Sequence, residues 1–218
     1  MSEKTLKDQN AWLLRGFILL VGILFFGFCY GMPAIDADSW DSLAARFSDT
    51  LGPASFGLVV LSITKLWLLG FLPPRLRDQI VHWRIKNPLP GSKAFSKIGP
   101  NDQRVDLVKL ASDHGVLPIE EADQGRLFYR IYKSVDGSAG VDDAHRSYLA
   151  ARDCATMAFL FLFILTPVVY WVSQDAKIAV TFGIILIVTF LMMSLSAQTY
   201  SVRFVQNVLA QASAKTVP

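Results

Sequence analysis

Four basic side chains form the densest group of residues that could bind a ligand: Arg75, Arg77, Arg84 and Lys86. They follow directly after an apolar stretch of the chain. Beside a bilayer, each such cation adds about 1 kcal/mol of attraction to anionic lipid. Completed between subunits by Arg126 or Arg130, the same cations could instead hold a phosphate-bearing ligand or a nucleotide signal. The absence of a glycine-rich phosphate loop favours the lipid contact.

Lys65 is the only charged side chain well inside an apolar stretch, eight residues before Pro73. At a rise of 1.5 Å per residue, it lies about 12 Å from the end of that stretch. A charge at this depth is a candidate for ion conduction or gating. The alternative is that its aliphatic stem lies along the helix and carries the ammonium group to the membrane interface.

Pro167, Gly27 and Gly31 are candidates for shaping apolar helices. Pro167 stands in the middle of an apolar stretch, where it removes one helical hydrogen bond and favours a kink. Gly27 and Gly31 are one helical turn apart, which permits close helix packing within or between subunits.

Catalytic and metal-binding motifs were sought among the histidines, cysteines and glycines. The chain has no phosphate loop, dinucleotide-binding fingerprint, His-Glu-x-x-His or Cys-x-x-Cys motif. His82, His114 and His145 stand about thirty residues apart, and only His145 has a second possible ligand, Asp142, nearby. The sequence therefore predicts a protein that is not an enzyme and that has no catalytic residue, metal site or cofactor.

The composition explains where these residues must be positioned. Of 218 residues, 52% are hydrophobic and 18% are charged, against about 25% charged in soluble domains. Four apolar stretches of membrane-spanning length contain almost none of the charges. A net charge of +3 is too small to indicate nucleic-acid binding. The pattern predicts an all-α protein with the lipid bilayer as its partner.

The predicted architecture has four transmembrane helices, at residues 12–32, 53–72, 155–172 and 178–197. The remaining segments are an N-terminus at 1–11, an outer loop at 33–52, an insert at 73–153, an outer turn at 173–177 and a C-terminal helix and tail at 198–218. The insert holds thirteen of the basic residues. Because basic loops stay on the cytoplasmic side, we expect a multi-pass protein of the bacterial inner membrane with a cytoplasmic insert and both termini inside.

Helices are expected in the connecting segments as well. In the outer loop, apolar residues from Trp40 to Phe47 recur at helical spacing, which fits an interfacial helix or a helical turn packed on the bundle. A helix is expected to continue from the second span to Asn87. Further helices are expected at 102–113, with Val105, Val108 and Leu110 inward, and from Pro118. The inward stripe of the latter is Leu127, Phe128, Ile131, Tyr132 and Val135.

The ends of the insert are expected to join it mechanically to the membrane. A glycine-rich hinge at 137–140 precedes Asp142, which can cap a helix running into the third span. Beyond the fourth span, helical spacing continues through Val205 and Leu209, so the tail is expected to pack against the insert. About 80 residues are few for an independent core, so part of its burial is expected to come from the spans or from neighbouring subunits. Together with the Gly27 and Gly31 spacing, this predicts a homo-oligomer.

Three segments of the insert, at 87–95, 101–106 and 145–153, resemble uncharacterised bacterial membrane proteins of similar layout. In layout alone, the chain is also similar to small multi-span components of bacterial antiphage systems. This resemblance implies a possible role in antiviral defence and no particular functional residue.

Three functions are therefore considered. The first is an oligomeric membrane effector or sensor, in which the insert receives a soluble cytoplasmic protein partner or a small ligand and acts on the bundle. The second is a passive scaffold that docks a soluble partner at the membrane. The third is a small channel or transporter subunit, which is disfavoured because the spans lack acidic, histidine or cysteine pairs.

Overall fold

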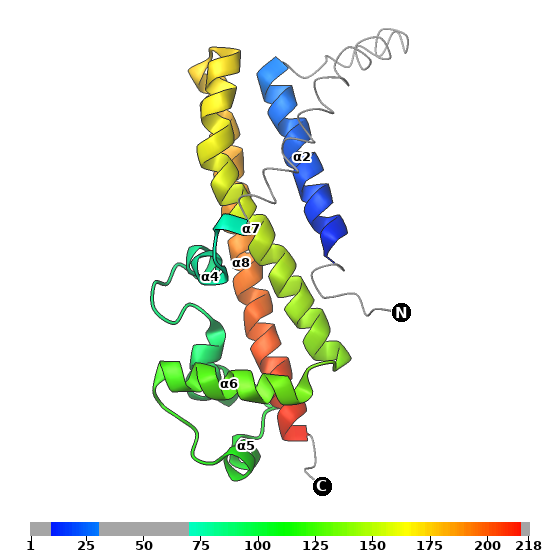
Figure 1. Ribbon diagram of the computed structural model, residues 1–218, viewed down its shortest axis with the longest axis vertical. Helices are drawn as coiled ribbons and strands as arrows, with labels where there is room; N and C mark the ends of the chain where they lie inside the picture. Colours follow the sequence, from blue (N-terminus) through cyan, green and yellow to red (C-terminus); the bar gives the residue numbers. More distant parts are fainter. Residues whose placement is uncertain (1–9, 31–69, 215–218) are drawn as a thin grey trace. The chain divides into compact units, whose positions relative to one another are not determined.

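The computed structural model of the protein describes residues 10–30 and 70–214, which form helices joined by short loops (Figure 1). No strand occurs within these ranges, so the predicted all-α class is confirmed for them. The α-helices are α2 (Ala11–Tyr30), α4 (Pro74–His82), α5 (Leu107–His114), α6 (Glu121–Val135), α7 (Ala139–Ser173) and α8 (Ala176–Ala214). Between α4 and α5 lie three short helical turns, η1 (Pro90–Lys93), η2 (Ala94–Ile98) and η3 (Gly99–Asn101).

Three helices, α2, α7 and α8, are long and apolar enough to cross a membrane. Their outward side chains include large apolar groups, such as Phe163 at 63% exposure and Trp171 at 75%. Such surface is unfavourable in water and ordinary in lipid, which indicates a membrane protein. Residues 53–69 of the predicted second span, including Lys65, lie outside the described residues, as do the predicted outer-loop helix and Gly31.

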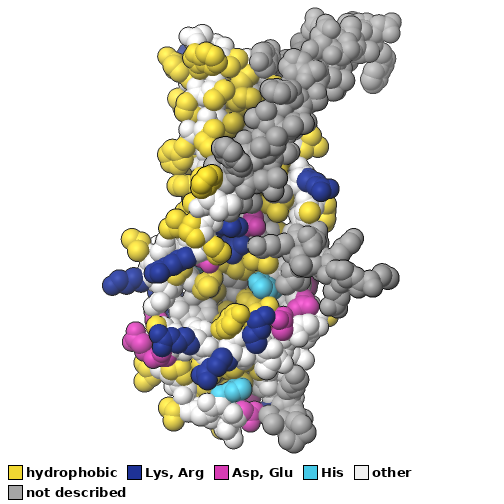
Figure 2. All heavy atoms as spheres, viewed as in Figure 1, with side chains coloured by type: hydrophobic (Ala, Val, Ile, Leu, Met, Phe, Trp, Pro, Cys, Tyr) yellow, Lys and Arg dark blue, Asp and Glu magenta, His cyan; other side chains and the backbone are white. Residues whose placement is uncertain are grey.

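The chain divides into two compact units, to which α7 and α8 both contribute. We call them the apolar unit, residues 11–73 and 153–192, and the helical domain, residues 1–10, 74–152 and 193–218. In Figure 2, the visible side chains of α7 and α8 in the apolar unit are largely hydrophobic, whereas charged side chains gather over the helical domain. The surface of the apolar unit therefore suits lipid, and the surface of the helical domain suits water.

Aromatic and small residues pack the helices of the apolar unit. The ring of Phe182 on α8 lies 6.2 Å from that of Phe25 and 5.5 Å from that of Phe28, both on α2. Gly183 permits a close contact between α8 and α7, because a Cβ there would lie 3.3 Å from Cγ2 of Thr166. Gly27 is half-buried on α2. Pro167 is exposed inside the uninterrupted α7.

The core of the helical domain combines α6 with the first turns of α7 and the last turns of α8. The rings of Phe128 and Tyr132 meet Phe204 of α8 edge to face, at 5.8 and 5.2 Å between centroids. The predicted inward stripe of α6 and the predicted packing of the tail on the insert are both confirmed. The buried residues of this core are Ala94, Phe95, Ile98, Leu110, Leu127, Phe128, Ile131, Tyr132, Val135, Val141, Val205, Val208, Leu209 and Ala212.

The prediction of one helix that continues from the second span to Asn87 is wrong about where the helix starts and where it ends. The chain leaves the helical conformation at Leu72 and Pro73, and a separate helix, α4, begins at Pro74. A residue that precedes a proline is pushed away from the helical region, and Pro73 is such a residue. At the other end, α4 stops at His82 because Trp83 adopts a φ of 52°.

The helix predicted at 102–113 begins later, at Leu107, because Asp106 caps it. Its carboxylate accepts a hydrogen bond from the backbone N–H of Lys109 at 2.9 Å. Leu110 is fully buried as expected, but Val108 is 82% exposed. Leu107 and Leu110 are three residues apart and share the inward face, from which Val108 is turned by about 100°.

The hinge expected at 137–140 is shorter than its glycine pattern suggests, and its backbone N–H groups are hydrogen-bonded. Only Gly137 and Ser138 separate the C-cap of α6 from α7, and Gly137 adopts a φ of 89°. Its N–H donates to the carboxylate of Asp142 at 3.3 Å, and the N–H of Ser138 donates to the carbonyl of Val135 at 3.3 Å. The predicted helix from Asp142 into the third span is confirmed as α7.

Replacing Gly91 by alanine is expected to destabilise the helical domain by about 1 to 2 kcal/mol. A Cβ at this position would lie 2.5 Å from Cδ1 of the buried Phe128 ring, which cannot move without disturbing Phe204. Hydrogen exchange of α6 in the detergent-solubilised protein measures the loss. The matched control is Gly140→Ala, where nothing lies within 4 Å and a helical position gains up to ~1 kcal/mol from alanine. Equal exchange in both variants would contradict the expected clash.

Candidate functional site

A buried polar cluster joins α4 to α7 within the helical domain. Asp78 of α4 accepts a hydrogen bond from the hydroxyl of Tyr148 at 2.8 Å and pairs with Arg152 at 3.2 Å. All three residues are buried. The guanidinium also lies over the Tyr148 ring, 5.7 Å from its centroid. Removing charges from water is costly, so this cluster has to keep its partners to be tolerated.

A second polar contact joins α4 to α8. The side-chain amide of Gln198 donates to the carbonyl of Val81 at 2.8 Å. Val81 stands in the last turn of α4, where helix carbonyls have no helical partner. One short helix is therefore bonded through side chains to both long helices that enter the helical domain.

A cationic pocket of about 320 Å³ lies beside these contacts. It is lined by the end of α4, by the helical turns that follow and by one side of α8. Its residues are His82, Arg84, Pro88, Pro90, Lys93, Lys97, Ile98, Asn101, Gln198, Ser201, Val202 and Gln206. Among the residues that the structure describes, the lining includes three cations and no carboxylate.

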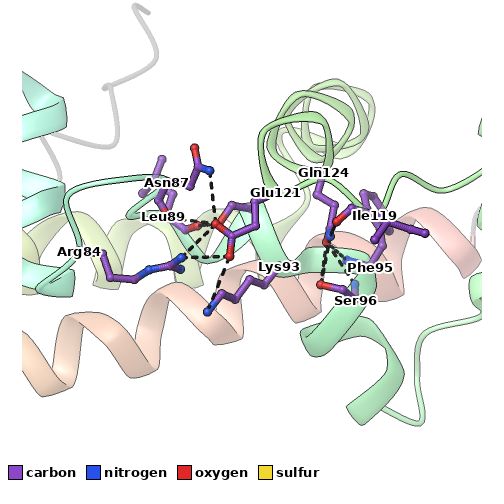
Figure 3. A network of polar contacts seen from close by, with 10 residues as sticks. Arg84, Asn87, Leu89, Lys93, Phe95, Ser96, Ile119, Glu121 and Gln124 are labelled. Atoms are coloured by element: carbon purple, nitrogen blue, oxygen red, sulfur yellow. Dashed lines mark hydrogen bonds and ion pairs between the residues drawn. The ribbon is translucent and has the colours of Figure 1, made fainter.

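Glu121 at the start of α6 partly balances the pocket cations (Figure 3). Its two carboxylate oxygens each accept a hydrogen bond from Nη2 of Arg84 at 3.0 Å, and Lys93 Nζ lies 4.0 Å away. The amide of Asn87 donates to it at 3.3 Å. The hydrogen bond from Arg84, followed by that from Asn87, holds the pKa of Glu121 below its usual value. Lys97 has no acidic partner among the described residues.

Gln124 fixes the turn that carries Lys97. Its amide is fully buried, and its Oε1 accepts from the backbone N–H groups of Phe95 and Ser96, both at 3.1 Å. Its Nε2 donates to the carbonyl of Ile119 at 2.8 Å. Figure 3 shows this amide between η2 and the loop before α6. The first N–H groups of a helical turn need such acceptors, so Gln124 holds η2 in place.

His82 is shared between the pocket and the cluster on α4 and α7. Its ring centroid lies 6.0 Å from that of Tyr148, and its Nε2 is buried with no hydrogen-bond partner among the described residues. Burial lowers the pKa of His82, while the nearby Asp78 opposes this effect. Burial thus favours the neutral form of the imidazole.

The four basic residues singled out in the sequence do not share one environment. Arg84 lines the pocket, Arg77 is buried, and Arg75 and Lys86 are exposed on and just after α4. The proposed companions are elsewhere, because Arg126 pairs with Asp123 on the surface and Arg130 is exposed.

The pocket cations Lys93 and Lys97 were not predicted from the sequence. They are four residues apart, a spacing that places two side chains on one helical face, and this was the available signal. Their convergence on α8 depends on a long-range contact that the spacing does not reveal.

His145, considered as a possible ligand with Asp142, takes part in packing. Its ring stacks on Phe204 at 4.6 Å, and its Nδ1 lies 3.2 Å from the Tyr132 hydroxyl. No group of three His, Cys, Asp or Glu side chains suited to a metal ion occurs among the described residues.

Comparison with known proteins adds no assignment. No protein-family model, no curated protein and no solved structure matches this chain. Its function must therefore be argued from the pocket and from the helices that form it.

Proposed function

We propose that the protein is an oligomeric effector or sensor of the bacterial inner membrane, and not an enzyme. Its helical domain faces the cytoplasm, receives a small ligand or a soluble protein partner, and acts on the membrane helices. Antiphage defence is the proposed process, by resemblance in layout alone. No resident cofactor, metal or bound nucleic acid is part of this proposal.

The observation that supports the proposal best is that α8 forms one wall of the cationic pocket. Gln198, Ser201, Val202 and Gln206 line it, and the same uninterrupted helix contains a candidate membrane span. A ligand that contacts these residues therefore acts directly on a membrane-crossing helix. A passive scaffold would not need its recognition site on such a helix.

The proposed coupling runs through contacts that the ligand would alter. Gln198 lines the pocket and also bonds to Val81, so a ligand that takes its amide competes with the contact between α4 and α8. His82 lines the pocket and touches the Tyr148 ring of the buried polar cluster. Occupied and empty pockets would thus favour different positions of α4 against the two long helices.

Membrane potential in bacterial cells that produce the full chain tests the proposal. An effector is expected to depolarise the membrane as its amount rises. Gln198→Leu, which removes the bond to Val81, should change the protein level needed for depolarisation severalfold at equal membrane content. The matched control is Gln211→Leu, an exposed position on the same helix, which should behave like the unmodified chain.

The alternatives give other results. A passive scaffold leaves the membrane polarised at every level, and that result would overturn the effector proposal. A constitutive channel depolarises the membrane equally with and without the Gln198 side chain, which would separate conduction from the helical domain. In that case Lys65→Met is expected to alter the current if the intramembrane charge conducts or gates.

Assembly into at least a dimer is a separate expectation. The helical domain has a small core, and Gly27 stands half-buried on α2 where a larger side chain would block a close neighbour. Mass photometry in mild detergent should show particles of at least twice the chain mass. Gly27→Leu should shift them toward monomer, whereas Gly16→Leu, with nothing within 4 Å, should not. Monomers alone in the unmodified chain would contradict this expectation.

A further inference from the structure

We propose that the cationic pocket binds a phosphate group attached to a partly apolar molecule. The inference rests on the proposed function in one respect, because it names the chemical class of ligand for the same site. Two sources share this chemistry, a phospholipid headgroup that enters from the membrane and a soluble phosphorylated compound.

Charge is the first argument for phosphate. Arg84, Lys93 and Lys97 line the pocket, and within residues 10–30 and 70–214 the single carboxylate in contact with them is that of Glu121. The described groups around the pocket therefore keep an excess of positive charge. A phosphate group carries between one and two negative charges near pH 7, which matches that excess.

The second argument for phosphate is that the pocket offers hydrogen-bond donors, which phosphate oxygens accept. Glu121 takes hydrogen bonds from Nη2 of Arg84, and Arg84 has further N–H donors that the fork geometry can offer to a second acidic group. The ammonium of Lys97 adds three donors. Amide groups of Asn101 and Gln206 also line the pocket and have no hydrogen bond within the described part of the chain.

The volume and lining of the pocket indicate that the bound phosphate carries an organic group. A volume of about 320 Å³ exceeds what one phosphate needs and lies at the lower end of the ~300–1,000 Å³ typical of small-molecule sites. Pro88, Pro90, Ile98 and Val202 provide an apolar side of the wall. The fitting ligand is therefore a phosphate ester with a carbon-containing group, either glycerol-based or another small organic group.

The position of the pocket along α8 supports a lipid source. Gln198 immediately follows the predicted fourth span at 178–197, and the pocket wall continues over the next two turns. Side chains at this distance from a span reach the headgroup layer, where basic residues meet anionic phosphates. Soluble phosphate compounds reach the same pocket from the aqueous side.

Calorimetric titration of the purified full chain in a neutral detergent tests the proposal. The probes are inorganic phosphate and the short-chain lipid dihexanoyl phosphatidic acid below its micelle concentration, each at constant ionic strength with chloride as the reference anion. We expect saturable binding of at least one probe. Lys93→Ala combined with Lys97→Ala should weaken that binding at least tenfold. Arg126→Ala combined with Arg130→Ala removes the same charge from the exposed face of α6 and should change it less than twofold.

The relative affinities of the probes identify the source. Tenfold tighter binding of the lipid indicates a headgroup site, whereas equal binding of the two probes would overturn the apolar part of the proposal, because the phosphate alone would then be recognised. Lys97→Gln, at an exposed position, serves as a second variant if the double substitution disturbs folding, and it should weaken binding severalfold. Absence of binding to both probes would overturn the proposal, as would equal weakening in the α6 control, which indicates bulk charge.

The binding and depolarisation experiments fail independently. Pocket-dependent binding without any effect on membrane potential would remove the effector function and keep the phosphate site. Depolarisation that depends on Gln198, together with no binding of either probe, would keep the effector function and remove the phosphate ligand.

Discussion

Replacement of Asp78 by alanine is expected to destabilise the helical domain by about 3 to 5 kcal/mol, the usual cost of breaking a buried ion pair. The substitution removes the acceptor of the Tyr148 hydroxyl and the carboxylate paired with Arg152, while both of those groups stay buried. The positive charge then loses a compensating partner in a region of low dielectric. This is the largest single-residue effect that we expect in the helical domain.

Hydrogen–deuterium exchange of α4 and of residues 141–152 measures this loss in the full chain. Because 1.4 kcal/mol corresponds to a factor of ten, exchange through opening of the domain should accelerate by more than about a hundredfold. The control is Asp123→Ala, which removes an exposed pair with Arg126 and should cost at most ~0.5 kcal/mol. Asp78→Ala combined with Arg152→Met should recover part of the loss, because neither charge of this pair then remains buried. Equal exchange in the two aspartate variants would contradict the buried role.

Gln124→Met is expected to cost about 2 to 3 kcal/mol, because each buried polar group left without a partner costs ~1–3 kcal/mol. Methionine preserves the length of the side chain and removes the acceptor for the N–H groups of Phe95 and Ser96 and the donor to Ile119. The turn η2 should therefore open more often. Lys97, which η2 carries to the pocket wall, would be held less well.

Two measurements separate this effect from a general loss of packing. Exchange at residues 94–98 should accelerate by roughly thirtyfold or more, since 2 kcal/mol corresponds to about that factor. Binding of the phosphate probe should weaken in parallel, although Gln124 does not line the pocket. Gln211→Met on the exposed side of α8 is the control. Unchanged exchange at residues 94–98 would contradict the positioning role of Gln124.

The parts of the fold that sequence predicts are those governed by helical periodicity. Five residues of α6 from Leu127 to Val135 form a continuous stripe, and all are buried as expected. The spacing of Val205, Val208 and Leu209 likewise predicts that the helix continues past the fourth span and packs on the insert. Apolar residues at helical spacing form one face of a helix, and that face is buried away from water. The pattern therefore predicts which side of each helix packs inward.

The candidate site was predictable only in part, because it depends on contacts between distant residues. Arg84 was singled out, but its pairing with Glu121 and its approach to α8 follow from tertiary packing. Gln124 is a polar residue on an otherwise apolar stripe, and nothing in its local sequence predicts the five hydrogen bonds that its side chain makes. Val108 was wrongly predicted to face inward because the predicted helix began at residue 102. In the structure the helix begins at Leu107, after its N-cap residue Asp106.

The shared core has a consequence for how the protein is made. Residues 94–141 pack against residues 205–212 of α8, so the helical domain lacks part of its interior while the ribosome is still synthesising the last helix. Until that helix emerges, the apolar stripe of α6 has no partner on α8 and needs shielding from other chains. Completion of the core therefore requires these C-terminal turns of α8. A chain in which they are displaced leaves the stripe of α6 uncovered and open to cellular proteases.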